Sequence, residues 1–203
     1  MRLEMAFPRD AQEIARVYRD AFPESVHFFF RRKSPEKLLD LLELAFLTIF
    51  YWGGQAILVK DDQGSVKGYC FYLSQATGSH KPNGRHVVAL LARMMRKITL
   101  PEITRLLHNQ LAMVTSVKRI EKIPKAQAKI LSVAINPLYQ GQGLGTMLLE
   151  GVLAELHDQA IVLNVRAKNP AGRRLYAAAG FKQYGTTKDL SGEWIMLVKQ
   201  PDY

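Results

Sequence analysis

The sequence predicts a mixed α/β (α+β) fold in which one central sheet, mostly antiparallel, is flanked by helices. Two pairs of short apolar segments are each joined by a brief polar turn, which is typical of antiparallel hairpins. Amphipathic helical patterns separate these pairs from further apolar segments, so helices are expected to cover the sheet. Strands and helices do not alternate strictly, which argues against a doubly wound parallel domain.

The N-terminal part predicts one strand and two helices. Apolar and polar residues alternate in residues 3–7, as in a short strand. Asp10 is positioned to cap a helix that Pro23 ends. The pair Ser34–Pro35 predicts a second helix start, and Gly53–Gly54 predicts its end.

The middle of the chain predicts a hairpin followed by a helical insertion. Residues 55–60 and 65–74 are apolar segments on either side of the polar sequence DDQG, which indicates two antiparallel strands. Two amphipathic helices follow, and Pro101 opens the second. Its apolar face is predicted to contain Ile103, Leu107, Leu111, Val114 and Val117.

The C-terminal part predicts strand, helix, strand, helix and a final hairpin. Residues 128–135 form a strongly apolar segment, and a helix follows to about Leu156. The later elements are a strand at 161–165, a helix from Asn169–Pro170 to near Gly180, and two strands at 181–187 and 193–199. With no repeat present, we expect a single domain, 1–203, with a helical insertion at about 80–125 between the third and fourth strands.

Positive charge is concentrated in the insertion. The chain carries a net charge of +10, and residues 80–129 hold eleven Lys or Arg against Glu102 and Glu121. One interpretation is a pair of amphipathic helices with solvated charged faces. The other is a surface for an acidic acceptor, a nucleic acid, an acidic carrier protein or a membrane. No nucleic acid is expected, because the basic residues are interleaved with apolar ones and no known binding motif is present.

The N-terminus and the cysteine content predict a cytoplasmic protein. Residues 1–10 contain Glu4 and Asp10 and lack the apolar segment of a signal peptide. The longest apolar stretch, from Leu41, is too short and too interrupted to insert into a membrane. Cys70 is the only cysteine and alternates with aromatic residues in a predicted strand, so we interpret it as a packed side chain.

Three glycines stand where a helix begins, within the sequence INPLYQGQGLGTMLLE of residues 135–150. Bare backbone at a helix start allows phosphate to approach unpaired N–H groups. A P-loop would need lysine before Thr146, and the dinucleotide motif has different glycine spacing. The motif Q/R-x-x-G-x-G/A fits in full, with Gln140, Gly143 and Gly145, after a strand that ends at Pro137.

With this motif the chain resembles the GNAT superfamily of N-acetyltransferases, and a second block supports the resemblance. Residues 169–181 are similar to the family pattern N-x-x-A-x-x-x-Y-x-x-x-G-F, with Asn169 and Tyr176 in place. Gly172 stands where the pattern has alanine. The resemblance covers Leu131 to Phe181 well and the flanking elements loosely.

The resemblance implies acetyl-CoA as cosubstrate and no metal. The pyrophosphate would lie on backbone N–H groups of the glycine turn, and the pantetheine arm would enter a gap where the preceding strand separates from the next. The residues implied in cofactor binding are Val133, Ala134, Ile135, Gln140, Gly141, Gln142, Gly143, Leu144, Gly145, Thr146, Asn169 and Tyr176. Asn169 also has a second interpretation, as the cap of its helix.

The resemblance further implies Tyr176 as the proton donor to the thiolate. A phenol has a pKa of roughly 10 and a thiol roughly 8.5, so the phenol remains protonated beside the sulfur at neutral pH. The general base is not identified by the sequence. Glu24 and Glu193 are weak candidates, and His27 is interpreted as a packed histidine among apolar residues.

The function implied by the resemblance is acetyl transfer to a primary amine by direct attack in a ternary complex. The alternatives are a longer-chain acyl-CoA transferase and a catalytically weak acetyl-CoA sensor. The expected partner is a small-molecule or peptide amine, and the basic insertion favours one that carries negative charge. A homodimer is compatible with this description.

Overall fold

The computed structural model describes residues 1–75, 83–120 and 126–201. Its strands are β1 (Arg2–Met5), β2 (Gln55–Lys60), β3 (Val66–Ser74), β4 (Lys118–Arg119), β5 (Ala128–Ile135), β6 (Ile161–Arg166), β7 (Lys182–Asp189) and β8 (Gly192–Lys199). Its α-helices are α1 (Ala11–Ala21), α2 (Pro23–Phe30), α3 (Pro35–Tyr51), α4 (Gly84–Met95), α5 (Leu100–Thr115), α6 (Leu144–Glu155) and α7 (Pro170–Ala178). Two 3-10 turns, η1 (Pro8–Asp10) and η2 (Pro137–Tyr139), precede α1 and α6.

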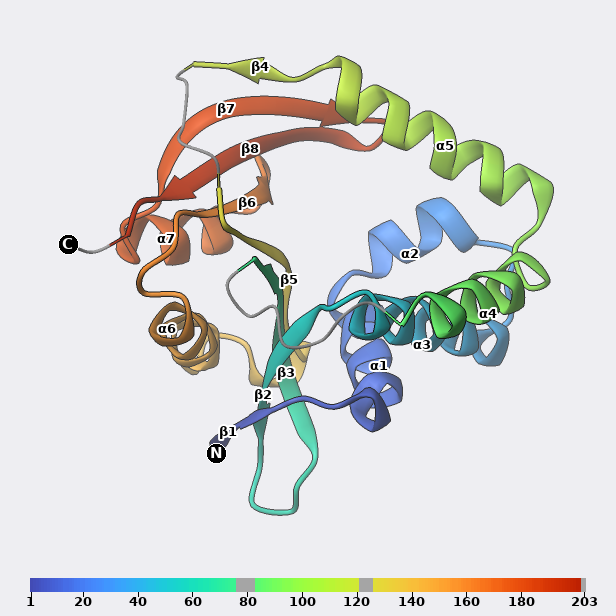
Figure 1. Cartoon of the computed structure of the whole chain (residues 1–203), viewed down its shortest axis with the longest axis horizontal. Coiled ribbons are helices and arrows are strands. Elements are labelled where there is room, and N and C mark those ends of the chain that lie inside the picture. Colours follow the sequence, from blue (N-terminus) through green and yellow to red (C-terminus); the bar gives the residue numbers. More distant parts are fainter. Residues whose placement is uncertain (76–82, 121–125, 202–203) are drawn as a thin grey trace.

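One continuous sheet joins the two halves of the described chain (Figure 1). Its strand order is β1-β2-β3-β5-β6-β8-β7-β4. β5 and β6 are parallel neighbours, and the other pairs are antiparallel. The predicted mixed α/β fold with a mostly antiparallel sheet is therefore confirmed.

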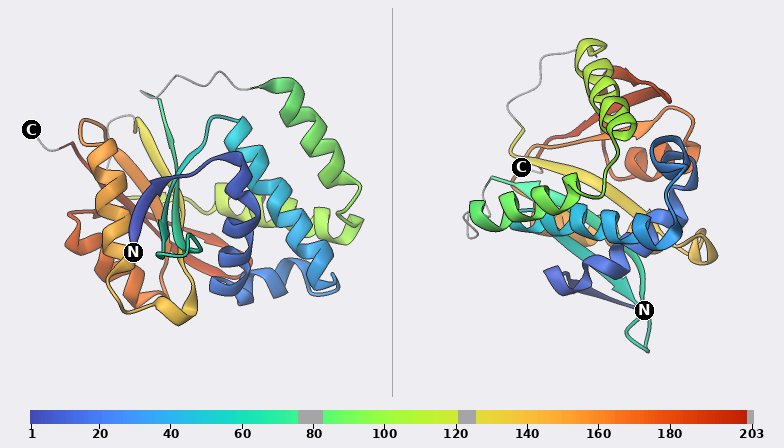
Figure 2. Two further views of the ribbon diagram at one scale, coloured as in Figure 1. Left: turned by 90° about the horizontal axis from the view of Figure 1, so that it is seen from below. Right: turned by 90° about the vertical axis from the view of Figure 1, so that its right-hand side faces the viewer.

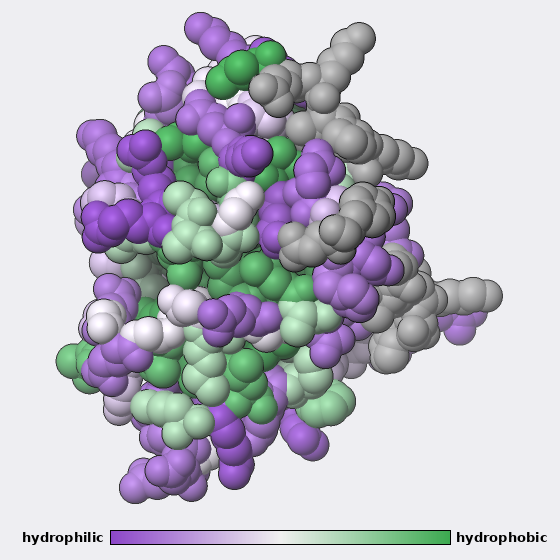
Figure 3. Space-filling view, turned by 90° about the vertical axis from the view of Figure 1, so that its left-hand side faces the viewer, coloured by the Kyte–Doolittle hydropathy of each residue, from purple (hydrophilic) through white to green (hydrophobic). Residues whose placement is uncertain are grey.

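Two apolar clusters cover the two faces of this sheet. In β2, Ile57 and Val59 belong to the cluster that includes α6, whereas Ala56 and Leu58 belong to the cluster with α1 and α3. Because both faces are covered, the middle of β2, residues 56–59, is a continuous apolar run and does not alternate. The left view of Figure 2 shows α6 on one side of the sheet and α1 and α3 on the other. From the side of α6 and α7, hydrophilic residues surround an apolar area (Figure 3).

The helix starts follow the sequence with one exception. Ser34 caps α3 by accepting a hydrogen bond from the Lys37 N–H, with oxygen and nitrogen 3.4 Å apart. Asp10 does not cap α1 through its side chain. Its carboxylate instead accepts the Phe7 N–H at 2.8 Å and pairs with Lys60 at 3.3 Å, which closes the turn before the helix.

Helix α2 was not predicted, although the end of the first helix before Pro23 was. α1 does end just before it, at Ala21, but Pro23 is the first residue of α2 because its fixed φ suits a first helical turn. Glu24 therefore lies in the first turn of a helix and not in a loop. The interpretation of His27 as a packed histidine is wrong, since it is exposed on α2.

The basic insertion contains the two predicted helices and an unpredicted strand. α4 packs beside α3, and α5 approaches β7. The two-residue strand β4 then pairs with β7 at the sheet edge, with Lys118 opposite Thr186. The predicted ends of the insertion, residues 80–82 and 121–125, lie outside the described residues. No helix in the described part of the chain has the length and apolarity to cross a bilayer.

The predicted apolar face of α5 is largely exposed. Leu107, Leu111 and Val114 are 64, 59 and 63% exposed, and Val117 lies beyond the helix end. α5 is joined to the β7–β8 region by hydrogen bonds, such as that from the Leu190 N–H to the Asn109 side-chain oxygen at 3.1 Å. Helical spacing identified an apolar stripe here, but spacing does not determine which face of a helix meets the sheet.

A buried ion pair holds the start of α5 to the α2–α3 connection. The Lys33 ammonium lies 3.1 Å from the Glu102 carboxylate, and the two side chains are 5 and 9% exposed. Lys33 also donates to the Lys97 carbonyl at 2.7 Å. Burial acts to raise the pKa of Glu102, but the Thr99 N–H and the Lys33 ammonium outweigh it and hold that pKa below its usual value.

We expect Glu102→Gln to lower the free energy of unfolding by about 3 kcal/mol, because it leaves the Lys33 ammonium buried without a counter-charge. Glutamine still accepts the Thr99 N–H, so the substitution removes the charge and keeps the capping box. Asp40→Asn is the control, since Lys97 and Asp40 are 36 and 55% exposed and such a pair contributes about 1 kcal/mol or less. Urea unfolding of both variants measures the difference, and equal losses would contradict the assignment.

Candidate active site

The cleft arises where β5 separates from β6. The two strands pair only at Ala128 with Ile161 and at Lys129 with Val162, although both continue well beyond these residues. A cleft of about 1020 Å³ occupies the resulting gap. Its walls are the free side of β5, the turn before α6, the first turns of α2 and α7, and the ends of β6 and β8.

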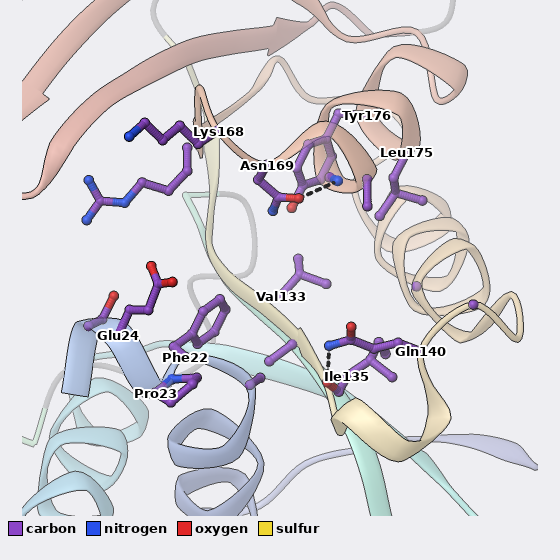
Figure 4. A pocket seen from close by; sticks show the side chains of 18 of the residues that line it. Phe22, Pro23, Glu24, Val133, Ile135, Gln140, Lys168, Asn169, Leu175 and Tyr176 are labelled. Atoms are coloured by element: carbon purple, nitrogen blue, oxygen red, sulfur yellow. Dashed lines mark hydrogen bonds between the residues drawn. The ribbon is translucent and has the colours of Figure 1, made fainter. Parts of the chain in front are cut away.

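Backbone N–H groups of β5 point into this cleft. The Asn136 N–H bonds to the Lys67 carbonyl at 2.8 Å, so it faces β3. Because N–H directions alternate along a strand, the N–H groups of Ile135 and Val133 face the opposite side, toward the gap. The carbonyl of Ile135 accepts the Gln140 side-chain N–H at 3.1 Å (Figure 4). The Gln140 amide thus covers one polar group of the open strand edge. In the described ranges, no acceptor bonds to the N–H groups of Val133 and Ile135.

The glycine turn places further N–H groups beside the cleft. Gly141 and Gly143 have φ values of +78° and +79°, which other residues adopt with strain, and a Cβ at either would meet no atom within 4 Å. α6 begins directly after Gly143 without a side-chain cap. Among the described residues, no acceptor bonds to the N–H groups of residues 144–146. A row of unpaired donors at a helix start is suited to phosphate.

Asn169 and Gly172 form a matched pair on the opposite wall. The Asn169 side-chain oxygen caps α7 by accepting the Gly172 N–H at 2.9 Å. A Cβ on Gly172 would lie 2.7 Å from the Asn169 side-chain nitrogen, which is too close. Glycine at the position where the family pattern has alanine therefore allows this conformation of Asn169. The capping interpretation of Asn169 is confirmed, and its amide nitrogen remains directed toward the cleft region (Figure 4).

Tyr176 enters the cleft from α7. It is 8% exposed, and its ring packs edge-on against Phe181 with centroids 5.8 Å apart. Burial raises its pKa above the usual value of a phenol, so the hydroxyl stays protonated at neutral pH. The side chain is thus a packed residue that lines the cleft and keeps its hydroxyl proton at neutral pH.

The structure brings eleven of the twelve predicted cofactor residues to the cleft lining. Gln142 is the exception, because its exposed side chain donates to the Leu138 carbonyl at 3.4 Å. Glu24 and Glu193 line the cleft, whereas His27 does not. Cys70 is fully buried in the sheet, as expected for a packed thiol.

Arg166 and Lys168 also line the cleft and were missed by sequence reasoning. The available signal was their place directly after the apolar strand IVLNV, opposite the glycine turn. Arg166 is fixed by Asp189 at 2.7 Å, and its guanidinium lies 3.9 Å from the Trp194 ring centroid. Arg166 therefore adds a positive charge to the cleft wall in a fixed position.

The model of the acetyltransferase (GNAT) family matches residues 12–181. The chain belongs to this family. A ribosomal protein bS18-alanine N-acetyltransferase of Salmonella typhimurium is 37% identical over 67 residues, which is 32% of this chain and 45% of that protein. The match therefore spans less than half the length of this curated relative.

Solved structures show the GNAT fold over the whole chain. An N-acetyltransferase from Staphylococcus aureus Mu50 has a TM-score of 0.65 with 18% identity, over 98% of this chain and 100% of that one. A putative acetyltransferase from Salmonella typhimurium, solved with its cofactor acetyl-CoA, has a TM-score of 0.57 with 16% identity over 99% and 94% of the chains. At these identities the likeness concerns the fold.

We expect Asp189→Asn to destabilise the protein by about 2–3 kcal/mol at pH 7, because the carboxylate is buried against Arg166. Burial acts to raise the pKa of Asp189, but its hydrogen bonds with Arg166 and Ser191 outweigh this and lower the pKa to about 2. In the unfolded chain the pKa of an aspartate is about 3.9, which is higher than in the folded protein. The ionised Asp189 therefore stabilises the folded protein fully at pH values above about 3.9, and this contribution is lost as the pH falls toward 2.

The difference between parent and variant should therefore narrow as the pH falls below about 4. Urea unfolding at pH 7 and pH 3 measures it. Asp62→Asn serves as the control because the Asp62 side chain is 97% exposed, and it should change nothing measurable. A difference for Asp189→Asn that stays constant with pH would contradict the assigned carboxylate.

Proposed function

We propose that this chain is an acetyl-CoA-dependent N-acetyltransferase that moves an acetyl group to a primary amine by direct attack in a ternary complex. The observation that carries the proposal is the open edge of β5, whose Val133 and Ile135 N–H groups face the same cleft as the unpaired N–H groups of α6. One set of donors suits a thioester carbonyl and the other suits a diphosphate. The family membership also supports N-acetyltransferase activity.

The cleft residues fit acetyl-CoA on two points. The absence of side chains at Gly141 and Gly143 leaves the backbone open to a diphosphate. The gap between β5 and β6 has a strand edge on one side, which suits the amide-containing pantetheine arm. Acetyl-CoA supplies the acetyl thioester, and the chain supplies positioning, hydrogen bonds and proton transfer.

Two groups in the cleft have the properties that the reaction needs. A strand N–H at Val133 or Ile135 would polarise the thioester carbonyl, since it is fixed before the reaction. The Tyr176 hydroxyl, kept protonated by burial, would donate to the sulfur as the carbon–sulfur bond breaks and the carbon–nitrogen bond forms. Glu24 and Glu193 line the cleft as acceptors for the amine proton.

The identity of the acceptor and several partner assignments stay predictions. The bS18-alanine N-acetyltransferase relative acts on an alanine of a protein, which supports a peptide amine as acceptor here. A negatively charged acceptor, a homodimer, the absence of a nucleic-acid partner and a cytoplasmic location stay predictions from the sequence. Binding of acetyl-CoA without turnover of any peptide or small amine would favour the sensor alternative.

We expect Gly143→Asp to weaken CoA binding at least tenfold, because a carboxylate would project where a diphosphate must approach the backbone. Calorimetry measures the affinity. Gly64→Asp is the matched control, since Gly64 has a φ of +81° and an equally open Cβ position in the β2–β3 turn. The control reproduces the backbone strain without the steric block, so equal CoA affinity in both variants would exclude this turn as the phosphate site.

We expect Tyr176→Phe to keep the affinity for acetyl-CoA and to lower kcat by roughly a hundredfold, since one general-acid contribution is removed. Only a hydroxyl is lost, so the packing against Phe181 remains. Steady-state kinetics with a free-thiol readout measures kcat. An unchanged kcat, under conditions in which acetyl transfer limits the rate, would remove Tyr176 from the mechanism.

A further inference from the structure

A second hollow, of about 610 Å³, lies between the α2–α3 connection and the α4–α5 connection. Among the residues that the structure describes, it shares no lining residue with the cleft. The cationic residues that line it are Arg31, Arg32, Lys33, Lys37, Lys97 and Arg105. Two segments that are sixty or more residues apart in the sequence therefore bring positive charge to one place.

The positive charge of this hollow is not neutralised by its own lining. Among the described residues that line it, Glu102 is the one acid, and it is paired with Lys33 at 3.1 Å. Lys97 is paired with Asp40 at 2.9 Å. Within the described ranges, the side chains of Arg31, Arg32 and Lys37 have no ion-pair or hydrogen-bond partner.

Arg105 adds a fourth cation in a fixed position. Its guanidinium donates to the Phe28 carbonyl at 2.7 Å and lies 5.6 Å from the centroid of the Phe28 ring. This bond uses one of the five N–H groups of arginine, so the others are free to bind an anion. Arg93 and Arg96, which the sequence places within one turn of Lys97, do not line the hollow.

We propose that this hollow binds a small molecule that carries two or more phosphate groups. The hollow is lined by three unpaired cations and Arg105. A ligand that matches them must carry several negative charges in a small volume, which a single carboxylate does not provide. Arginine binds phosphate through two parallel N–H bonds, and three of the lining cations are arginines. A volume of about 610 Å³ is within the range of pockets for nucleotide-sized ligands.

The arrangement favours a compact anion over an extended acidic peptide. Arg31, Arg32 and Lys33 come from the α2–α3 connection and Lys97 from the α4–α5 connection. Lys37 and Arg105 come from α3 and α5, so positive charge reaches the hollow from both segments, whereas an extended peptide would need charges along a groove. The starts of α3 and α5, at Ser34 and Thr99, also lie in the lining, and their dipoles add to the positive field. The proposal is independent of the acetyl-transfer function, because the hollow and the cleft are separate.

The test compares the parent, Arg31→Ser/Arg32→Ser and Arg93→Ser/Arg96→Ser. Both double variants lose two positive charges from exposed arginines, but only the first loses them from the hollow. Calorimetry with inorganic pyrophosphate at 0.15 M salt, roughly the physiological ionic strength, measures binding. Any pyrophosphate at the glycine turn is common to the three proteins, so the difference between them isolates the hollow.

We expect Arg31→Ser/Arg32→Ser to weaken one pyrophosphate site at least tenfold, since hydrogen bonds to charged groups are lost. Arg93→Ser/Arg96→Ser should stay within about twofold of the parent, given that these arginines lie outside the hollow. Equal affinity in all three proteins, or an equal loss in both double variants, would overturn the proposal. Tighter binding of tetraglutamate than of pyrophosphate, lost only in Arg31→Ser/Arg32→Ser, would overturn the phosphate class. Thermal unfolding without ligand checks that each variant is folded.

Discussion

The site depends on the separation of β5 from β6 after two paired residues. A strand in the middle of a sheet normally has both sets of backbone groups bonded to neighbours. β5 keeps its bonds to β3 along most of its length but loses β6, so one row of its N–H and C=O groups lacks a strand partner. Such groups are costly in a protein interior unless a ligand, water or a side chain satisfies them. Gln140 satisfies one of them, and the remaining donors define what the cleft can bind.

The separation also determines what the neighbouring elements must do. η2 and the glycine turn redirect the chain from the end of β5 into α6, and α6 closes one face of the sheet below the gap. α7 closes the gap on the far side and brings Tyr176 into it, with Asn169 fixing its first turn. Arg166 ends β6 and is held in the cleft wall by Asp189, which comes from the next hairpin. Each of these contacts lies beside the gap between β5 and β6.

The parts of the site that sequence predicts are those encoded by neighbouring residues. The glycine turn requires positive φ at Gly141 and Gly143, and that requirement is visible in the residue type itself. The Asn169 cap is visible for the same reason, since cap and capped N–H are three residues apart. Features that depend on tertiary contacts were not predictable. The start of α2 at Pro23 is a different case, because proline at a first helical position is a local signal that also marks the start of α3.

The apolar stripe on α5 illustrates the same limit. The spacing of Leu107, Leu111 and Val114 is correct for a buried face, yet the face is exposed in the described structure. Likewise, the charge count located basic residues in the insertion, but the hollow draws half of its cations from the α2–α3 connection, outside the insertion. Amphipathic spacing and net charge are properties of a segment, whereas burial and a binding hollow are properties of two segments that meet.

Helix α2 contributes residues to the walls of both cavities. Within its eight residues, Glu24 and Phe28 line the cleft while Phe29 lines the hollow, so the cavities are separated by the thickness of one short helix. A rotation of α2 about its own axis would change both walls together. Ligands that prefer different orientations of α2 would then oppose each other, and ligands that prefer the same orientation would cooperate. Linkage makes such coupling reciprocal, so each ligand would shift the affinity of the other by the same factor.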